Sequence, residues 1–513
     1  MKRGSTVLFL LLLAVYGLPG AFAQSGSDFI YTTADGQVTI TGYTGNAVAV
    51  RIPVTIGGLP VTCIGNFAFD RRKDITSVSI PESVTSIGIG AFDDCTGLTS
   101  INIPTGVTTI GNSAFGGCTG LASVNIPASV TSIGDNAFSR CTSLSSINIP
   151  AGVTRIELGT FSRCTSLSSI NIPESVTDIG AFAFHDCTGL SSIDIPAGVT
   201  SIGDWAFSGC SGLTSIRMGA GLTSIERGAF TGCTGISSIR IPESVTFIGG
   251  NAFAGCTGLS AVHIPANVTD IEFNPVRECS SLTAIQVDAD NAAFSSRNGV
   301  LFTKKGDTLI AYPPGLKGQY AIPADVTRIG LNAFYACTSL TAVSIPSGVT
   351  CIEASAFEGC TGLSTVRIPA SVTDIPANPF KGCAGLTAIQ VDSDNKRYTS
   401  RNGALLNKTG DTLIAYPEGR KGQYAIPEGV TLIEGGVFKD CPDLTAVIIP
   451  ESVTGIMYMA FDGCTGLTSI RIGANVDFTA TAFENRFYGY YNRTGKKAGV
   501  YTWNGSAWSY AAQ

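Results

Sequence analysis

Cysteine recurs in this chain at a fixed interval of 23 residues. The interval holds through nine successive cysteines and resumes twice further along: Cys95, Cys118, Cys141, Cys164, Cys187, Cys210, Cys233, Cys256 and Cys279; Cys337, Cys360 and Cys383; Cys441 and Cys464. The same interval carries a fixed set of apolar residues, as in CTGLTSINIPTGVTTIGNSAFGG from residue 95 to 117. A unit this short cannot bury its own apolar side, so stacked copies must bury it together. The 23-residue repeat therefore predicts one elongated solenoid.

Each repeat contains two short extended segments. In LTSINIP (98–104), Ile101 and Ile103 alternate with polar residues, which is the pattern of a strand with one buried face. The proline ends this strand because it has no N–H to donate. The second segment is VTTIG (107–111), and the Phe of the following AF pair is the largest core side chain. Stacked in register, the copies predict a β-rich solenoid of about 18 turns, with a parallel concave β-sheet and short convex turns.

Two longer units interrupt the interval. Cys279 and Cys337 are 58 residues apart, and so are Cys383 and Cys441. The extra residues lie near 288–323 and 392–427. In each, apolar segments flank a turn rich in Lys, Gly and Asp, which predicts a β-hairpin. We expect both hairpins to protrude from the same side of the solenoid.

The N-terminal end departs from the repeat. Residues 1–23 combine two basic residues, an apolar run and a small-residue cleavage pattern, which is typical of a secretory signal peptide. No second apolar run predicts a membrane span in the mature chain. Residues 24–59 alternate like a strand pair and are expected to cap a solenoid at 60–473. The protein is therefore expected to be exported, to the extracellular space or the cell surface, with the periplasm as a possible alternative.

The C-terminal end is aromatic and basic. Residues 474–513 are expected to form a C-terminal cap, with a sorting tail as the alternative. Aromatic residues on both sides of Asn504-Gly505 predict a small hairpin within this segment.

Composition argues against several function classes. A net charge of −6 does not provide the basic field that nucleic-acid binding requires. The two histidines, His185 and His263, stand at variable positions, and no phosphate loop or metal-ligand motif occurs. We therefore expect no catalytic residue, no cofactor and no metal site.

DADN (288–291) and DSDN (392–395) resemble the start of a calcium loop, but Gly299 stands where the last acidic ligand of the first loop would be. We therefore expect these residues to cap turns, with calcium binding as the alternative.

The repeated cysteines allow two interpretations. Export permits a disulfide ladder. Side chains at equivalent places of parallel strands lie about 4.8 Å apart and point the same way, which fits disulfide geometry poorly. We therefore expect buried free thiols. At the first turn Arg72 replaces the cysteine, which fits a half-open end position.

The motif CTGLTSINIPTGVTTIGNSAF resembles the BspA-like family of leucine-rich repeats, also called treponemal-type leucine-rich repeats. The resemblance covers roughly residues 50 to 473 and includes the long units with SRNGVLF and TLIAYP. It implies a right-handed leucine-rich-repeat solenoid without enzymatic activity. Family members are typically secreted or surface-exposed, and several are implicated in adhesion to host extracellular proteins or other cells. The resemblance carries over no binding residue.

The variable outward position of the main strand is the best functional clue in the sequence. It holds a run of Asn early in the chain and becomes basic later. Repeat proteins commonly bind partners on this face. The candidate partner-binding residues are Arg217, Arg240, His263 and Arg367, together with Lys304 and Lys408 at the hairpins. A protein or glycan ligand is expected, adhesion is the predicted role, and the alternatives are drift at exposed positions and a structural, self-associating envelope protein.

Overall fold

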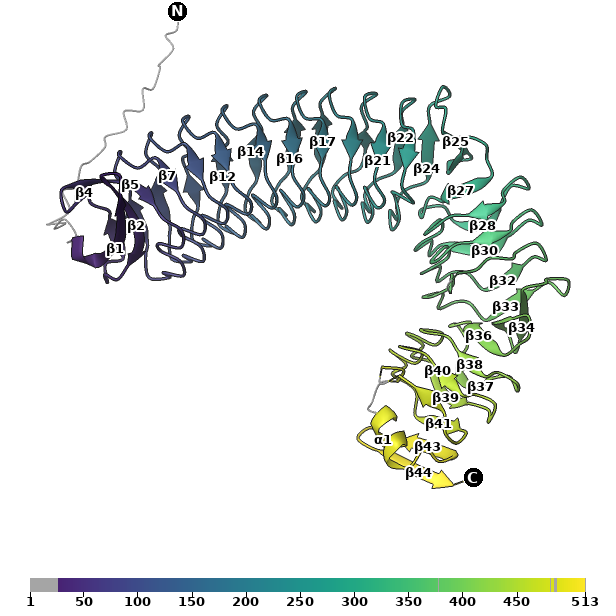
Figure 1. Ribbon diagram of the computed structural model, residues 1–513. Helices are drawn as coiled ribbons and strands as arrows, with labels where there is room; N and C mark the ends of the chain where they lie inside the picture. The colour runs from purple at the N-terminus through teal and green to yellow at the C-terminus, as the bar shows by residue number, and fades with distance from the viewer. Residues whose placement is uncertain (1–25, 377, 480, 484–486, 513) are drawn as a thin grey trace, which may run out of the picture.

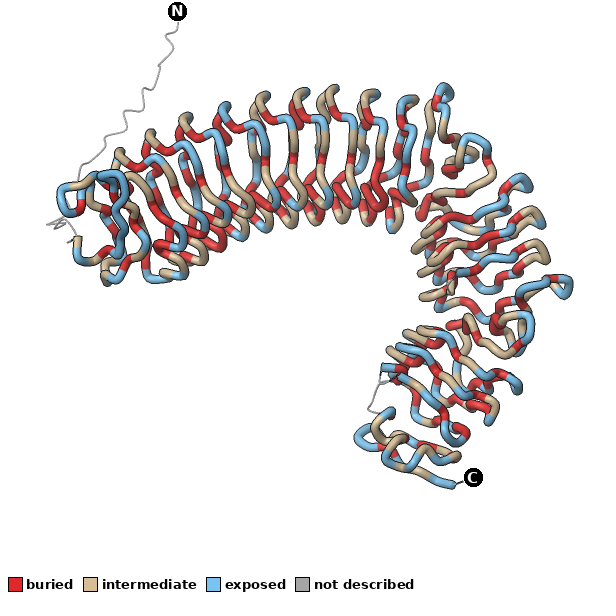
Figure 2. The backbone as a smooth tube through the Cα atoms, in the orientation of Figure 1, coloured by how far each residue is buried: buried red, intermediate tan, exposed pale blue. Residues whose placement is uncertain are grey.

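The computed structural model describes residues 26–376, 378–479, 481–483 and 487–512. The expected signal peptide lies outside them. The described chain winds into a solenoid that bends into an arch (Figure 1). In every turn buried segments alternate with exposed ones along the whole arch (Figure 2), so neighbouring turns share their buried interior. The solenoid predicted from the repeat is confirmed.

Strands from the LTSINIP segments stack in parallel into what we call the main ladder. Ser100, Ile101 and Asn102 show its pattern, because only the isoleucine is buried. The described chain contains one strand for each expected turn: β3 (Ala49–Arg51), β6 (Ser77–Ser79), β8 (Ser100–Asn102), β10 (Ser123–Val124), β12 (Ser146–Asn148), β14 (Ser169–Asn171), β16 (Ser192–Ile195), β18 (Ser215–Met218), β20 (Ile239–Arg240), β22 (Ala261–Ile264), β24 (Ala284–Val287), β28 (Gly318–Ala321), β30 (Leu340–Ser344), β32 (Thr365–Ile368), β33 (Ala388–Val391), β37 (Gly422–Ala425), β39 (Leu444–Ile448) and β41 (Ser469–Ile472).

The VTTIG segments form a second parallel stack, which we call the short ladder because most of its strands span two residues. Neighbouring turns pair position for position, as Ile110 does with Ile133. Its members are β5 (Leu59–Ile64), β7 (Ser86–Ile87), β9 (Thr109–Ile110), β11 (Ser132–Ile133), β13 (Arg155–Ile156), β15 (Asp178–Ile179), β17 (Ser201–Ile202), β19 (Ser224–Ile225), β21 (Phe247–Ile248), β23 (Asp270–Ile271), β27 (Thr308–Ala311), β29 (Arg328–Ile329), β31 (Cys351–Ile352), β36 (Thr412–Ala415), β38 (Leu432–Ile433), β40 (Gly455–Ile456) and β42 (Asp477–Phe478).

The AF-x-x-C turns form two columns inside the solenoid. From Phe69 to Phe253 the phenylalanine rings stack turn on turn, with centroids 5.0 to 5.9 Å apart. Beside them each cysteine Sγ donates to the carbonyl oxygen of the Phe one turn earlier, as Cys118 does to Phe92 at 3.2 Å. All sixteen cysteines are free. The disulfide alternative is therefore wrong, and burial raises the pKa of the Cys164 thiol to about 12.

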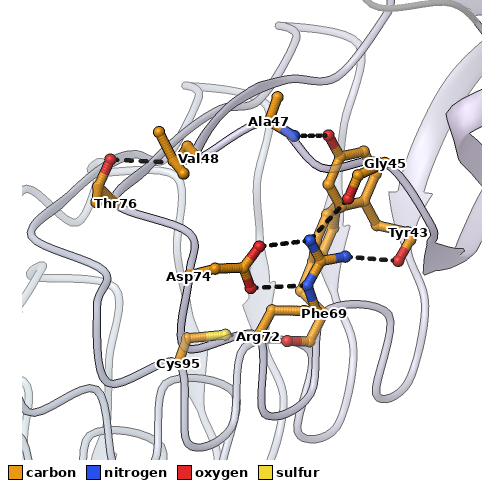
Figure 3. A network of polar contacts seen from close by, with 9 residues as sticks. All are labelled: Tyr43, Gly45, Ala47, Val48, Phe69, Arg72, Asp74, Thr76 and Cys95. Carbon is orange, nitrogen blue, oxygen red and sulfur yellow. Dashed lines mark hydrogen bonds and ion pairs between the residues drawn. The ribbon is translucent and has the colours of Figure 1, made fainter.

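Arg72 replaces the thiol at the first repeat (Figure 3). Its Nη1 donates to the Tyr43 carbonyl oxygen at 2.8 Å, and its Nη2 donates to the Gly45 carbonyl oxygen at 2.8 Å. Asp74 accepts from Nε at 2.9 Å and from Nη2 at 2.7 Å. The Tyr43 ring begins the aromatic column, 5.6 Å from Phe69. The Arg72 guanidinium therefore replaces the thiol of later turns as a hydrogen-bond donor. Each group donates to the backbone carbonyl oxygen of the aromatic residue one turn earlier.

The two long units form antiparallel strands, but their hairpins do not protrude as expected. In the first, β25 (Phe294–Arg297) pairs with β26 (Val300–Thr303), and β26 pairs with β27 across the predicted turn. In the second, β34 (Tyr398–Arg401) and β35 (Ala404–Asn407) repeat this arrangement before β36.

The middle strand of each insertion is buried on both faces, which explains why it cannot protrude. Leu301 packs into the preceding apolar core, whereas Val300 and Phe302 pack into the following one. In β35, Leu405 faces the preceding core and Leu406 the following one. Each insertion is thus a partition between two sections of core, and the arch changes direction at both (Figure 1).

Short antiparallel elements close the two ends. At the N-terminus a 3-10 turn (Gly26–Asp28) leads into β1 (Phe29–Ala34) and β2 (Gln37–Tyr43), which extend the short ladder, and β4 (Thr55–Ile56) pairs with β5. At the C-terminus α1 (Phe487–Arg493) precedes a hairpin of β43 (Gly499–Trp503) and β44 (Trp508–Ala512). This is the hairpin expected around Asn504-Gly505. Its first strand pairs with β41 and continues the main ladder.

Candidate binding site

The main ladder is interrupted between β18 and β20. β18 pairs with β16, whereas β20 pairs with β22, and within the described chain no strand pairing joins β18 to β20. A hollow of about 490 Å³ lies on this interruption, and we call it the seam site. Its lining includes Ile216, Arg217, Met218, Arg240, Pro242 and Glu243. In the described chain the main ladder is also broken between β14 and β16 and between β30 and β32, and the seam is the break on which this hollow lies.

Apolar side chains form part of this recess. Ile216 and Met218 are only half-buried. The equivalent residues of the preceding strand, Ile193 and Ile195, are each 3% exposed. The seam therefore leaves apolar surface partly open beside the outward-facing arginines, where a ligand could cover it.

An unusual turn lies beside the seam. Met218-Gly219 stands where most repeats have Ile-Pro. A β-carbon at Gly219 would lie 2.4 Å from the Pro196 carbonyl oxygen, and one at Gly221 would lie 2.0 Å from the Ala197 carbonyl oxygen. Only glycine permits so close an approach to the preceding turn. The turn after β18 therefore packs tightly on the preceding turn, and the recess lies beside it.

Arg217 and Arg240 occupy the same outward place in successive turns. Both are exposed, and neither forms an ion pair with any residue that the structure describes. In strand register Asp194 stands opposite Arg217, and His263 stands opposite Arg240. Two guanidinium groups without an ion pair, beside apolar surface, suit a ligand that carries a carboxylate, sulfate or phosphate group.

The other predicted residues have partners of their own. Arg367 lies beyond the first insertion, with its Nη2 3.0 Å from Asp392 Oδ2. The His263 Nε2 lies 4.0 Å from Asp288 Oδ2. Lys304 and Lys408 donate to backbone carbonyl oxygens of Ala289 and Ser393, at 3.3 and 3.4 Å, in their own insertions. The structure therefore brings together Arg217, Arg240 and His263, and places the other three elsewhere.

Sequence reasoning missed the recess itself and Glu243 at its edge. The sequence does mark this place, because Met-Gly replaces Ile-Pro in the turn after β18.

The expected turn use of DADN and DSDN fits the structure: Asn291 is fully buried, its Nδ2 donates to two backbone carbonyls, and its Oδ1 accepts from two backbone N–H groups. Asn395 repeats all four bonds.

Among the residues that the structure describes, no helix has the length and apolar character of a membrane span. No group of three or more His, Cys, Asp or Glu side chains in the same ranges is arranged to hold a metal ion.

A family model agrees with the geometry. The model described as "BspA type Leucine rich repeat region (6 copies)" matches residues 62–191, 177–298, 318–405 and 422–490. Among curated proteins no sequence matches.

Several solved bacterial structures are similar to this chain. A leucine rich cell surface protein from Faecalibacterium prausnitzii is 28% identical, with 88% of this chain and 95% of that chain covered and a TM-score of 0.40. A leucine-rich repeat protein from Bacteroides ovatus is 23% identical, with 90% and 99% covered and a TM-score of 0.43. The leucine rich repeat protein of T. pallidum is 30% identical over 46% of this chain and 91% of its own, with a TM-score of 0.32.

Proposed function

Because the chain belongs to the BspA-type leucine-rich repeat family, we propose that it is a secreted or cell-surface binding protein without enzymatic activity. Its ligand is an extracellular protein or glycan that presents an acidic group to the seam site. The observation that carries this proposal is the pair of guanidinium groups, Arg217 and Arg240, neither of which forms an ion pair with a described residue. Adhesion to a host surface or to other cells is the role we assign to this binding.

The chemistry of the seam favours an anionic group attached to a larger molecule. Two like charges on neighbouring turns repel each other, and a bound anion relieves that repulsion. The half-buried Ile216 and Met218 add apolar contact that a free small anion would not use. The recess is open to the ladder face, so a protein loop or a sugar chain can enter without displacing the solenoid.

The test replaces both arginines at once. Arg217→Ser with Arg240→Ser should weaken capture of heparin, or of an acidic extracellular matrix protein, by about 150-fold or more, because each charge-assisted hydrogen bond contributes ~1.5 to 3 kcal/mol. The salt dependence of binding should fall as well. Surface plasmon resonance at two salt concentrations, with circular dichroism as the folding check, provides the measurement.

Arg367→Ser is the matched control. It removes an arginine from the same outward place, but one already paired with Asp392. Its effect on binding should be within about twofold, as expected for a screened exposed ion pair. Equal binding by the parent and the double variant would contradict the proposal.

A structural, self-associating role is the second candidate. The observation that favours it is that β1 and β44 stand at the ends of their sheets, each with one free edge within the described chain. Free edges can pair with strands of another copy. Sedimentation of the purified protein separates the two functions, since a binding protein should stay monomeric without its ligand and an envelope protein should assemble.

A further inference from the structure

A second groove lies away from the seam site, on the turns between the AF pairs and the cysteines. It spans five successive turns in the purple-to-blue part of the arch (Figure 1). Asp93, Gly116, Ser139, Ser162 and His185 line it from the same place in each turn, 23 residues apart. The groove has a volume of about 520 Å³, and we call it the turn groove.

Small residues give the turn groove its depth. Gly116, Ser139, Gly159 and Ser162 leave space along its length, while the exposed side chains of Arg140 and Arg163 stand beside it. The groove therefore follows the axis of the solenoid and presents hydroxyl and guanidinium groups at each of several turns.

An aromatic residue, Phe182, lies at one end of the turn groove in an unfavourable backbone conformation. Phe182 has a φ of 56°, in the left-handed region that bulky side chains rarely adopt, and it is 40% exposed. The same place holds Asn136 and Asn251, which suit that backbone. Phe67 and Trp205 also stand at this place, but they lie against the glycine of the next turn.

Phe182 instead lines the turn groove. Its ring meets His185 edge to face at 5.7 Å, and Leu158 beside it is 43% exposed. The equivalent residue of the next turn is Trp205 and not glycine, so the exposed Phe182 ring, held in an unfavourable backbone conformation, indicates a surface used for contact.

The two arginines along the turn groove are already paired, unlike those of the seam site. Arg140 Nη2 lies 3.3 Å from Asp94 Oδ1, and Arg163 Nε lies 3.7 Å from Asp186 Oδ2. A charged ligand would have to compete with these pairs. Neighbouring donors and acceptors instead suit hydroxyl groups, which both donate and accept.

The spacing of the lining residues adds a second constraint. The phenylalanine rings of these turns lie 5.3 to 5.9 Å from their neighbours, and a ligand that uses the turns one after another must repeat at a similar interval. The rings of an extended hexose chain advance by about one turn each. Side chains on one face of an extended peptide recur only every ~6.6 Å, which is out of step with the turns.

We propose that the turn groove binds an uncharged linear oligosaccharide along the solenoid axis, one hexose ring per turn, with the Phe182 ring packed against the C–H face of one sugar. Ser139, Ser162 and the paired Arg140 and Arg163 bond the hydroxyl groups. This site is independent of the seam site in position and in ligand charge.

The test titrates the full chain with neutral hexasaccharides of β-1,4-glucose, α-1,4-glucose, β-1,3-glucose and β-1,4-mannose by calorimetry. At least one should bind, its affinity should rise with chain length up to about five rings, one per turn of groove, and added salt should change the affinity little because the ligand is uncharged. Phe182→Asn should weaken binding about tenfold, the loss of one aromatic contact, without disturbing the fold, since Asn occupies the same place elsewhere. Phe67→Asn, the same change outside the groove, should bind like the parent.

The Arg217→Ser, Arg240→Ser variant should bind the oligosaccharide unchanged, so the two proposals fail separately. Failure of all four hexasaccharides at millimolar concentration would overturn this one. Full binding by Phe182→Asn would also overturn it, as would displacement of the sugar by an acidic peptide or a sulfated chain competing for the same groove.

Discussion

The two insertions, at 288–323 and 392–427, are copies of one design that have kept some features and changed others. Both retain the buried asparagine, Asn291 or Asn395, with its four hydrogen bonds to backbone. Both retain a middle strand shared by two cores. Features that both insertions share are those we expect the change of direction in the arch to require, and features that differ are those it does not depend on.

The changes are in volume and charge. Phe302 of the first copy corresponds to Leu406 of the second, and both are fully buried. The buried Pro314 corresponds to Glu418, a carboxyl group that is only 8% exposed. Backbone hydrogen bonding is thus kept, whereas side-chain size and even polarity vary. Four predictions test this division.

The largest effect should come from the middle strands. Phe302→Ala should lower the free energy of unfolding by about 3 to 5 kcal/mol, and Leu406→Ala by about 2 to 4, because each leaves a cavity in proportion to the atoms removed. Urea unfolding followed by circular dichroism checks both values. Phe302→Leu, which makes the first copy resemble the second, is the matched control and should cost less than half as much. Equal losses for all three variants would break the comparison.

The conserved asparagines should matter equally. Asn291→Ala and Asn395→Ala should each cost about 3 kcal/mol, because both leave buried backbone donors and acceptors without partners. The same unfolding measurement applies. Asp290→Ala, at an exposed neighbouring position, should change stability little. A large difference between the two asparagine variants would show that the insertions do not share their framework.

The buried carboxyl group should make only the second insertion sensitive to pH. Burial raises the pKa of Glu418 to about 7, although the Gly382 N–H donates to it at 2.8 Å. Since the folded pKa lies above the unfolded value of 4.5, the parent should lose stability as pH rises from about 4.5 to 7.

Glu418→Gln removes this loss and should stabilise the protein by about 2 kcal/mol at pH 8. Unfolding at pH 5 and pH 8 provides the measurement. Glu434→Gln, at an exposed position, is the control. A Gln variant with the pH dependence of the parent would assign that dependence to another group.

The smallest effect should come from the arginines at the insertion surface. Arg297 Nη1 donates to both carboxylate oxygens of Asp325 at 2.8 Å, and its guanidinium lies 5.3 Å from the centre of the Phe302 ring. Arg401 reaches only the Glu428 carbonyl oxygen, at 3.5 Å. Arg297→Ala should therefore cost about 1 kcal/mol and Arg401→Ala close to none. Thermal unfolding in low and high salt checks the order.

Much of the fold could be predicted because the same pattern of apolar and polar residues recurs in many copies. The alternation in LTSINIP and the proline after it give the main ladder, and equal spacing gives its register. The buried insertions could not be separated from protruding hairpins by turn residues alone. A continuous apolar run, Val300-Leu301-Phe302, was the better signal, since strands buried on both faces show no alternation.

The candidate site was predictable only in part. The outward positions of Arg217, Arg240 and Arg367 follow from the strand pattern. Their different electrostatic situations do not, because Asp392 reaches Arg367 from the next turn. The recess lies beside the close approach of Gly219 to Pro196, which a linear pattern does not state. Long-range packing therefore decides which of several similar arginines is available to a ligand.

The partition strands have a consequence for how proteins of this kind can change in length. Corresponding residues of the two insertions, such as Asp288 and Asp392, are 104 residues apart, so a single block carries both straight turns and one change of direction. Gain or loss of a block would add or remove one change of direction together with its straight turns, whereas gain or loss of a single 23-residue turn would only lengthen or shorten a straight arm. Gene duplication could thus adjust reach and curvature separately, without redesigning any interface inside the stack.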